Sequence, residues 1–371
     1  MSNTIGNIPL IDVDKSINIL STMYTNVINN NVNLSKMPSV MLWGPPGVGK
    51  SQSIRELASI LEENTNKSVV ITDVRLILFN PIDLRGIPTA NEDKTLAVWL
   101  KPKIFDMSDS KDIINILFLD EISSASPSVQ AAAYQITLDR RVGEHKLPDN
   151  CIVIAAGNRV TDKAVAYQMP SALANRFMHL EIEANYESWN RWAILNDINP
   201  KVLGFLKFRS TYLHTFDPKT SSLVFSTPRT WELVSNILNN VSDNINDVFD
   251  LIAGLVGSGI ATEFKGWARV FKDLPDVKDI FDGKNVTIPT NTDTIYALTS
   301  SMVTYAKKYK DDLDKIANSI RYAEKLPPDF ALILLKDYMY IDKDYKLKLL
   351  RIPEYEKWAR TKGRLLDGAF R

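Results

Sequence analysis

The stretch "GPPGVGKS", which runs from Gly44 to Ser51, constrains the fold of this chain more than any other part of its sequence. The apolar run "SVMLW" before it predicts a strand, and "KSQSIRELASILEEN" overlapping its end predicts a helix. A strand, a glycine-rich loop and a helix in this order fit G-x-x-x-x-G-K-[ST], in which backbone N–H groups at a helix N-terminus hold phosphate oxygens. We therefore expect an α/β fold with a phosphate-binding loop after a buried strand.

Short apolar runs alternate with helical patterns from about residue 38, which predicts a parallel sheet covered by helices. The expected strands are 39–43, 68–74, 114–120, 151–157 and 178–183. Beyond Tyr186 the strand-like runs thin out and helical patterns take over, with a turn-rich break at 282–293. We expect an N-terminal linker (1–37), a three-layer α/β core with a five-stranded parallel sheet (38–185), a helical lid (186–290) and a helical C-terminal extension (291–371).

Composition narrows the class of protein. Forty-four basic residues balance forty-four acidic ones, so no net charge draws the whole chain to nucleic acid or anionic lipid. No apolar stretch reaches the roughly 20 residues of a membrane span, and "MSNTIGNIPLIDVDKS" lacks the pattern of a signal peptide. Cys151 is the single cysteine and opens the apolar run "CIVIAAG", which predicts a buried thiol. We expect a cytoplasmic protein.

The phosphate-binding loop predicts a nucleoside triphosphate and Mg²⁺ as ligands. Lys50 is expected to contact the β- and γ-phosphates, and the Ser51 hydroxyl is expected to bind Mg²⁺. The candidate nucleotide-binding residues are Gly44, Pro45, Pro46, Gly47, Val48, Gly49, Lys50, Ser51 and Gln52.

Two further strand ends carry polar side chains. The run "ILFLDEIS" ends in Asp120 and Glu121, which would emerge at the same edge of the sheet as the loop. Asp120 suits Mg²⁺ and Glu121 suits a general base for the attacking water, although such a pair taken alone is equally typical of solvated acids. Asn158 follows "CIVIAAG" and could orient the lytic water or touch the γ-phosphate; taken alone it is typical of a turn.

The order of "GPPGVGKS", "LFLDE", "AAGN", "ALANRF" and "STPRTW" resembles that of the AAA+ ATPases. Within them, "DEISSASPSVQAAAYQITLDRRVGEHKLPDNCIVIAAGNR" is similar to the MoxR-like branch, which is related to the dynein and midasin modules. In that branch a β-hairpin insert, here 140–148, interrupts this region, and "NPIDLRGIP" (80–88) resembles the loop after the second strand. The resemblance covers about residues 38–240.

This resemblance implies ATP and Mg²⁺ as cofactors and adds two arginines to the site. Arg176 matches the arginine that reaches into a neighbouring subunit's nucleotide site, and Arg229 matches a second sensor of the γ-phosphate on the lid. Read without the family, Arg176 is more typical of a surface residue with a salt bridge. For Arg229 the alternative is a plain arginine at a helix start. "ISSASPS" carries serines where many relatives have Asn-Arg, so the resemblance does not imply here any role that this arginine plays between subunits.

The implied function is that of a homo-oligomeric ring, most simply a hexamer, which hydrolyses ATP to remodel a protein client in the manner of a chaperone. Relatives of this branch often act with a partner that carries a von Willebrand factor A domain. One alternative is a nucleic-acid motor or loader, with Arg140, Arg141 and Lys146 of the hairpin lining a pore. Another is a nucleotide-gated scaffold with slow turnover. The C-terminal extension either packs against the lid or docks a partner.

Overall fold

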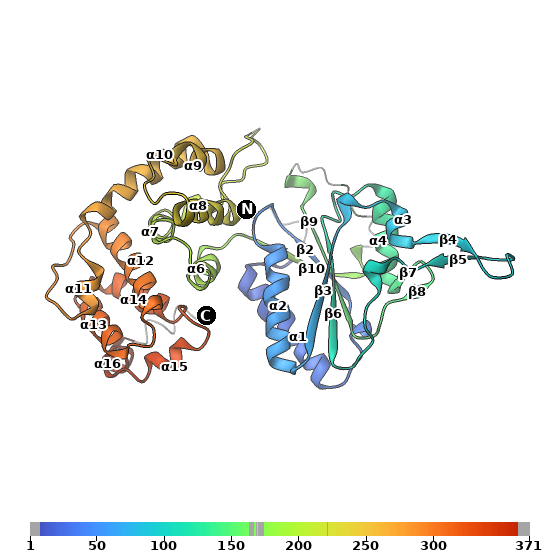
Figure 1. Ribbon diagram of the computed structural model, residues 1–371, viewed down its shortest axis with the longest axis horizontal. Coiled ribbons are helices and arrows are strands. Elements are labelled where there is room, and N and C mark those ends of the chain that lie inside the picture. Colours follow the sequence, from blue (N-terminus) through green and yellow to red (C-terminus); the bar gives the residue numbers. More distant parts are fainter. Residues whose placement is uncertain (1–7, 163–166, 168, 170–173, 221, 363–371) are drawn as a thin grey trace. The chain divides into compact units, whose positions relative to one another are not determined.

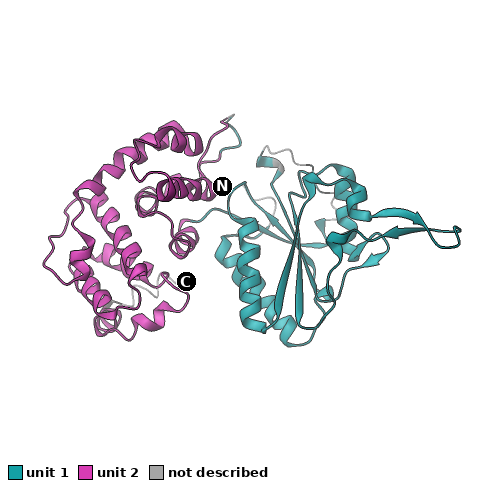
Figure 2. Cartoon of the chain, in the orientation of Figure 1, with its two compact units in different colours: residues 1–185, 217–221 teal, residues 186–216, 222–371 magenta. Residues whose placement is uncertain are grey.

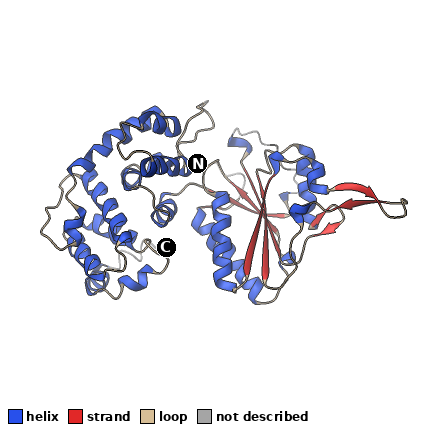
Figure 3. Cartoon of the chain, in the orientation of Figure 1, coloured by secondary structure: helices blue, strands red, loops and turns tan. Residues whose placement is uncertain are grey.

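The computed structural model describes residues 8–162, 167, 169, 174–220 and 222–362. The chain forms two compact units, residues 1–185 with 217–221 and residues 186–216 with 222–371 (Figure 2). The strands of the described chain all belong to the first unit, whereas the second unit is helical (Figure 3).

A six-stranded parallel sheet forms the centre of the first unit (Figure 1). Its strand order is β1-β10-β2-β9-β6-β3. The strands are β1 (Leu10–Ile11), β2 (Ser39–Trp43), β3 (Ser68–Arg75), β6 (Ile113–Asp120), β9 (Cys151–Gly157) and β10 (Phe177–Ile182). The α/β fold predicted from the sequence is confirmed, and the five predicted strands form within one residue of their expected ends.

Helices cover both faces of this sheet, which gives three layers (Figure 1). Their bounds are α1 (Val13–Asn29), α2 (Lys50–Thr65), α3 (Pro81–Arg85) and α4 (Pro127–Asp139). Side chains of α1 and α2 share one hydrophobic cluster with one face of the sheet, and side chains of α4 share a second cluster with the other face. The central strands β2 and β9 are buried at every position, which explains why they read as unbroken apolar runs.

The sixth strand comes from the segment that we expected to be a linker. Within residues 8–37, β1 pairs with β10, and α1 packs on α2. The signal for this helix is present in the sequence, because Ile17, Leu20, Tyr24 and Ile28 are spaced three or four residues apart and are all buried. Asp12 caps the helix by accepting the backbone N–H of Lys15 at 2.7 Å.

Two antiparallel hairpins extend the first unit. One pairs β4 (Ile87–Ala90) with β5 (Ala97–Leu100), and the other pairs β7 (Arg141–Val142) with β8 (His145–Lys146). The second hairpin lies inside 140–148 and confirms the predicted insert.

Arg140, however, is not available to line a pore. Its side chain is buried and donates to the carbonyl oxygens of Cys151 and Met37 at 2.8 and 2.7 Å. Arg140 therefore ties the end of α4 to the start of β9, because a buried guanidinium needs acceptors for its N–H groups.

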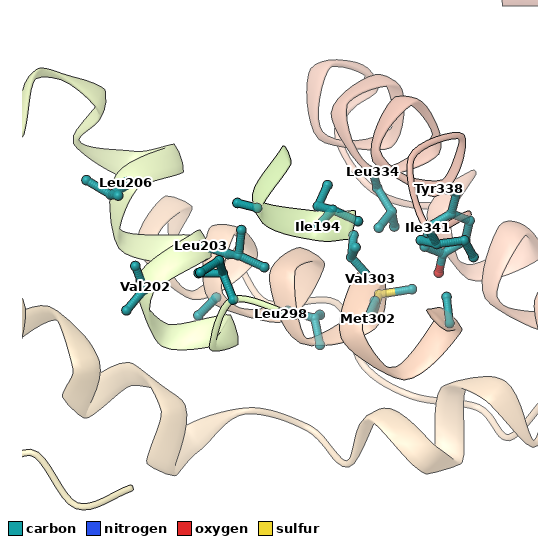
Figure 4. Close-up of a cluster of buried hydrophobic side chains, with 14 of the residues drawn as sticks. Ile194, Val202, Leu203, Leu206, Leu298, Met302, Val303, Leu334, Tyr338 and Ile341 are labelled. Carbon is teal, nitrogen blue, oxygen red and sulfur yellow. The ribbon is translucent and has the colours of Figure 1, made fainter. Parts of the chain in front are cut away.

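The second unit consists of helices around one continuous core. The helices are α6 (Tyr186–Leu195), α7 (Pro200–Phe208), α8 (Pro228–Asn240), α9 (Phe249–Val256), α10 (Ser258–Trp267), α11 (Val277–Phe281), α12 (Thr292–Lys308), α13 (Leu313–Ala323), α14 (Pro328–Tyr338), α15 (Tyr345–Leu349) and α16 (Pro353–Lys362). Figure 4 shows part of this core, where Leu203 of α7, Val303 of α12 and Leu334 of α14 are drawn together. Trp189 is buried in the same cluster and packs between helices.

The helical sequence pattern of residues 248–271 forms two helices rather than one. Gly257 separates α9 from α10 and has φ +89° and ψ 147°, a conformation that only glycine adopts readily. The helical pattern continues across the break, which is why periodicity alone did not reveal it.

Candidate nucleotide-binding site

The glycine-rich loop joins β2 to α2 through backbone that requires glycine. Gly49 is the N-cap of α2 and has φ +103°. A Cβ on Gly44 would lie 2.5 Å from the carbonyl oxygen of Ile182 on β10, so the loop begins against the neighbouring strand. The loop thus opens α2, a helix of 16 residues, whose N-terminal N–H groups and dipole favour an anion.

Lys50 lies inside the loop rather than in solvent. It is 9% exposed, and its Nζ donates to the carbonyl oxygens of Gly44 at 2.7 Å and Pro45 at 3.0 Å. Nζ also donates to Asn158 Oδ1 at 3.1 Å. The lysine is therefore held in the concavity of the loop, and the amide at the end of β9 is within its reach.

Ser51 and Asp120 meet across the sheet edge. The Ser51 hydroxyl donates to Asp120 Oδ2 at 2.9 Å, although 69 residues separate them in the chain. Asp120 is the last residue of β6, so the carboxyl end of this strand brings its carboxylate to the start of α2. A hydroxyl and a carboxylate oxygen are ligands that Mg²⁺ accepts.

Glu121 turns away from the strand with φ +58°, a left-handed conformation that non-glycine residues adopt rarely. Its N–H donates to Asp120 Oδ1 at 2.8 Å. Its half-buried carboxylate makes no hydrogen bond or ion pair with any residue that the structure describes. A carboxylate with this freedom can accept a proton from a water molecule, and strained backbone of this kind is often found at functional sites.

Asn158 is held by a residue that the sequence reasoning did not assign. The Asn158 N–H donates to Ser123 Oγ at 3.0 Å, and the carbonyl oxygen of Ser123 accepts from Gln130 Nε2 at 3.3 Å. A Cβ on Gly157 would lie 2.7 Å from Ser123 Oγ, so glycine is needed for this contact. Ser123 is one of the serines that depart from the family pattern. This departure is the feature of the sequence that could have indicated a role for Ser123.

Arg159 forms a second contact that the sequence reasoning missed. Its guanidinium contacts Asp162 at 2.9 Å and Glu181 of β10 at 2.5 Å, and both carboxylates are buried. Burial opposes the charge on Arg159, but the two carboxylates outweigh this effect and raise its pKa. Because β2 lies between β9 and β10, the Arg159–Glu181 pair links the two strands that flank the one leading into the loop.

Arg176 lies at the opposite edge of the sheet. It precedes β10, whose first residue, Phe177, pairs with Ser39 at the start of β2. Four steps of parallel strand, about 13 Å, separate the level of Ser39 and Phe177 from Trp43 at the entrance to the loop. Arg176 is exposed and has no hydrogen bond or ion pair within the described chain. The fold does not bring it to its own phosphate-binding loop.

Arg229 belongs to the second unit. It is exposed in the first turn of α8, where Thr227 is the N-cap and Pro228 the first helical residue. Among the remaining loop residues, Val48 is buried and Pro46 and Gln52 are half-buried.

These residues fit a nucleotide with its metal ion. The loop supplies an anion-binding helix N-terminus, Lys50 supplies a positive charge, and Ser51 with Asp120 supplies oxygen ligands. The parallel fold and this site define the class of protein, a P-loop nucleotide-binding protein.

Comparison with known families makes the class more specific. Residues 39–179 match the family described as "ATPase family associated with various cellular activities (AAA)". The matched segment is similar to this ATPase family and contains the loop, Asp120, Glu121, Asn158 and Arg176.

The chain is also similar to solved structures at low identity. These include NtrX from Brucella abortus (13% identity, TM-score 0.35, 81% of this chain and 64% of that chain covered) and RuvB from Thermotoga maritima (14%, 0.35, 78% and 84%). A third is the HORMA:CdnC:Trip13 complex of E. coli (13%, 0.38, 68% and 88%). The chain thus spans less than two thirds of NtrX. No match was found among curated proteins.

Within the described residues, no helix is both long and apolar enough to cross a lipid bilayer.

Proposed function

We propose that this protein is an ATP-hydrolysing remodeling ATPase of the MoxR-like branch, which acts as a homo-oligomeric ring, most simply a hexamer, on a protein client. The observation that carries the proposal is the separation of two half-sites. Lys50, Ser51, Asp120 and Asn158 meet at the carboxyl edge of the sheet, whereas Arg176 precedes the amino end of β10, about 13 Å away along the strands. A complete site therefore needs Arg176 from a second molecule.

Within one subunit, the proposed roles follow from the contacts. Lys50 and the loop N–H groups would bind the phosphates of ATP, and Ser51 and Asp120 would hold Mg²⁺, which neutralises charge on those phosphates when bound. Glu121 would accept the proton of the attacking water on its free carboxylate. Asn158, fixed by Ser123, would orient that water.

Two arginines would complete the site. Arg176 would place its guanidinium against the transferring phosphoryl group of the neighbouring molecule, and such arginines contribute about 10³–10⁵ to turnover in related enzymes. Arg229 would sense the γ-phosphate from the helical lid, so that hydrolysis changes the position of the lid.

A protein client is favoured over nucleic acid by the surface around the β4–β5 hairpin. Leu78, Ile87, Leu96 and Leu100 are each more than half exposed there, and apolar surface of this kind suits a protein segment better than a phosphate backbone. Because Arg140 is buried, it is not one of the basic side chains that could contact nucleic acid in a pore. A partner with a von Willebrand factor A domain remains part of the proposal on the family resemblance alone.

Two substitutions test the nucleotide site. Lys50→Ala should abolish ATP binding, whereas Glu121→Gln should keep binding and lose hydrolysis, because only the proton acceptor is removed. Equilibrium binding of labelled ATP and release of phosphate measure the two properties separately. If Glu121→Gln hydrolysed ATP at the wild-type rate, Glu121 would not be the base; if its other behaviour were also unchanged, the scaffold alternative would be favoured.

Mixed subunits test the shared site. A Lys50→Ala subunit lacks its own nucleotide site but still offers Arg176, and an Arg176→Ala subunit has the complementary defect. A mixture of the two inactive proteins should therefore regain hydrolysis. No recovery at any mixing ratio would contradict the role of Arg176 between subunits.

A further inference from the structure

A chain of hydrogen bonds runs through β10 from the nucleotide loop to the segment of Arg176. Trp43, the residue directly before Gly44, donates its indole N–H to His179 Nδ1 at 2.9 Å. His179 Nε2 lies 2.6 Å from the carbonyl oxygen of Ala174, two residues before Arg176. One imidazole thus connects the residue that precedes the phosphate-binding loop with the segment that carries Arg176.

The partners of His179 determine its protonation pattern. An indole N–H can only donate, so Nδ1 must be the acceptor. A carbonyl oxygen can only accept, so Nε2 must carry the proton and donate to Ala174. The ring is therefore a neutral imidazole with one donor and one acceptor, and both are used.

Aromatic side chains hold the ring in place. The planes of Trp43 and His179 are nearly parallel, 13° apart, with 6.1 Å between the centroids, so the rings lie edge to edge along their hydrogen bond; Phe177 lies at 6.0 Å with a tilt of 50°. Because Trp43 and Phe177 are both buried in the core on this face of the sheet, the imidazole has little freedom to turn.

The segment that His179 contacts is otherwise exposed. Asn175 and Arg176 lie in a turn on the surface, and the described chain gives the Arg176 side chain no partner. A hydrogen bond to the preceding carbonyl oxygen is therefore well placed to fix where this turn begins.

We propose that His179 is a positioning residue for Arg176. It holds the Ala174 carbonyl at a fixed place relative to the strand that enters the phosphate-binding loop, and so sets where the arginine is presented to a neighbouring molecule. This inference rests on the proposed role of Arg176 between subunits, and it assigns His179 no contact with the nucleotide.

Two amide substitutions separate the two hydrogen bonds of the ring. His179→Asn places an amide near the position of Nδ1, so it can accept from Trp43 but cannot reach Ala174. His179→Gln places its amide nitrogen near the position of Nε2, so it can still donate to Ala174. If His179 acts through Ala174, Gln should preserve its role and Asn should not.

The mixed-subunit assay shows in which subunit His179 acts. When His179→Asn is added to the Lys50→Ala subunit, which supplies Arg176, the recovered turnover should fall at least about tenfold, mainly in kcat, because a misplaced catalytic group costs rate. His179→Gln in the same subunit should retain most of the recovery. When His179→Asn is added to the Arg176→Ala subunit, recovery should stay close to that of the parent mixture.

The outcomes distinguish this inference from the proposed function. No recovery in the parent mixture would contradict the shared site itself, and the inference would fall with it. Recovery in the parent mixture that His179→Asn does not reduce would overturn the inference alone. An equal loss with His179→Asn in either subunit, as general misfolding would produce, would also overturn it.

Discussion

At the scale of single residues, the site depends on hydrogen bonds that hold the reacting groups in place. Asn158 is fixed through its backbone N–H by the Ser123 hydroxyl, and Ser123 is 4% exposed. A buried N–H without an acceptor costs about 1–3 kcal/mol, so the loop that carries Asn158 should shift when this hydroxyl is removed.

We therefore expect Ser123→Ala to lower kcat by about tenfold or more, since a small displacement of an orienting group is costly, while the Kd for ATP changes little. Steady-state hydrolysis and equilibrium nucleotide binding measure the two effects. Ser124→Ala is a matched control, because Ser124 contacts Glu121 only through its backbone N–H. Equal losses in both variants would show that Ser123 has no special role.

The roles of residues that belong to a fixed local sequence pattern could be predicted from the sequence. The roles of residues that depend on partners far away in the chain could not. Gly44 to Ser51 and Asp120 were recognisable because a phosphate-binding loop and an apolar strand with a terminal acid have characteristic patterns. Arg140 reads as an exposed base in "DRRVGEHK", yet its acceptors are the carbonyl oxygens of Met37 and Cys151. Only the fold brings these atoms together.

At the scale of secondary-structure elements, the break between α9 and α10 depends on one glycine. Gly257 has φ +89° and ψ 147°, and a Cβ there would meet no atom within 4 Å. Gly254 lies inside α9, also with no atom within 4 Å of its Cβ position. The two positions thus differ in backbone conformation and not in available space.

This contrast predicts opposite effects of the same substitution. Gly257→Ala should destabilise the protein by about 1–3 kcal/mol because alanine is strained in this conformation. Gly254→Ala should stabilise it by about 0.5–1 kcal/mol because alanine is the better helix former. Thermal unfolding followed by circular dichroism measures both effects. If the midpoint temperatures of the two variants shifted in the same direction, the assigned backbone conformation of Gly257 would be contradicted.

Helices and strands could be predicted from the sequence where the spacing of their apolar residues was clear. The buried strands β2 and β9 form at their predicted residues because continuous apolar runs between turn signals are typical of a parallel sheet. The helix α1 lies in the segment that we expected to be a linker, although its apolar spacing is regular.

At the scale of the whole molecule, the lid and the C-terminal extension share one core. Lys207 of α7 and Asp337 of α14 form an ion pair at 2.5 Å, and their side chains are 4% and 3% exposed. Asp337 also accepts from Asn190 of α6 at 2.7 Å. The expected functional division at residue 290 remains a proposal, but residues on both sides of it pack together.

Asp337→Ala should therefore lower the free energy of unfolding by about 3–5 kcal/mol, because it leaves the Lys207 ammonium buried without a counter-charge. Denaturant titration of the full chain measures the loss. Asp311→Ala removes a carboxylate that pairs with Lys348 on the surface and should leave the midpoint unchanged. Similar shifts for both variants would contradict the buried pair as a link within this unit.

The central claim is that one molecule holds only part of a working site. The most direct measurement is the specific ATPase activity of the wild-type protein over a range of protein concentrations, with the oligomeric state followed by sedimentation velocity. The account predicts that turnover per subunit rises as the protein assembles, and that Arg176→Ala assembles without this rise. Full activity per subunit at concentrations where the protein is a monomer would contradict the account.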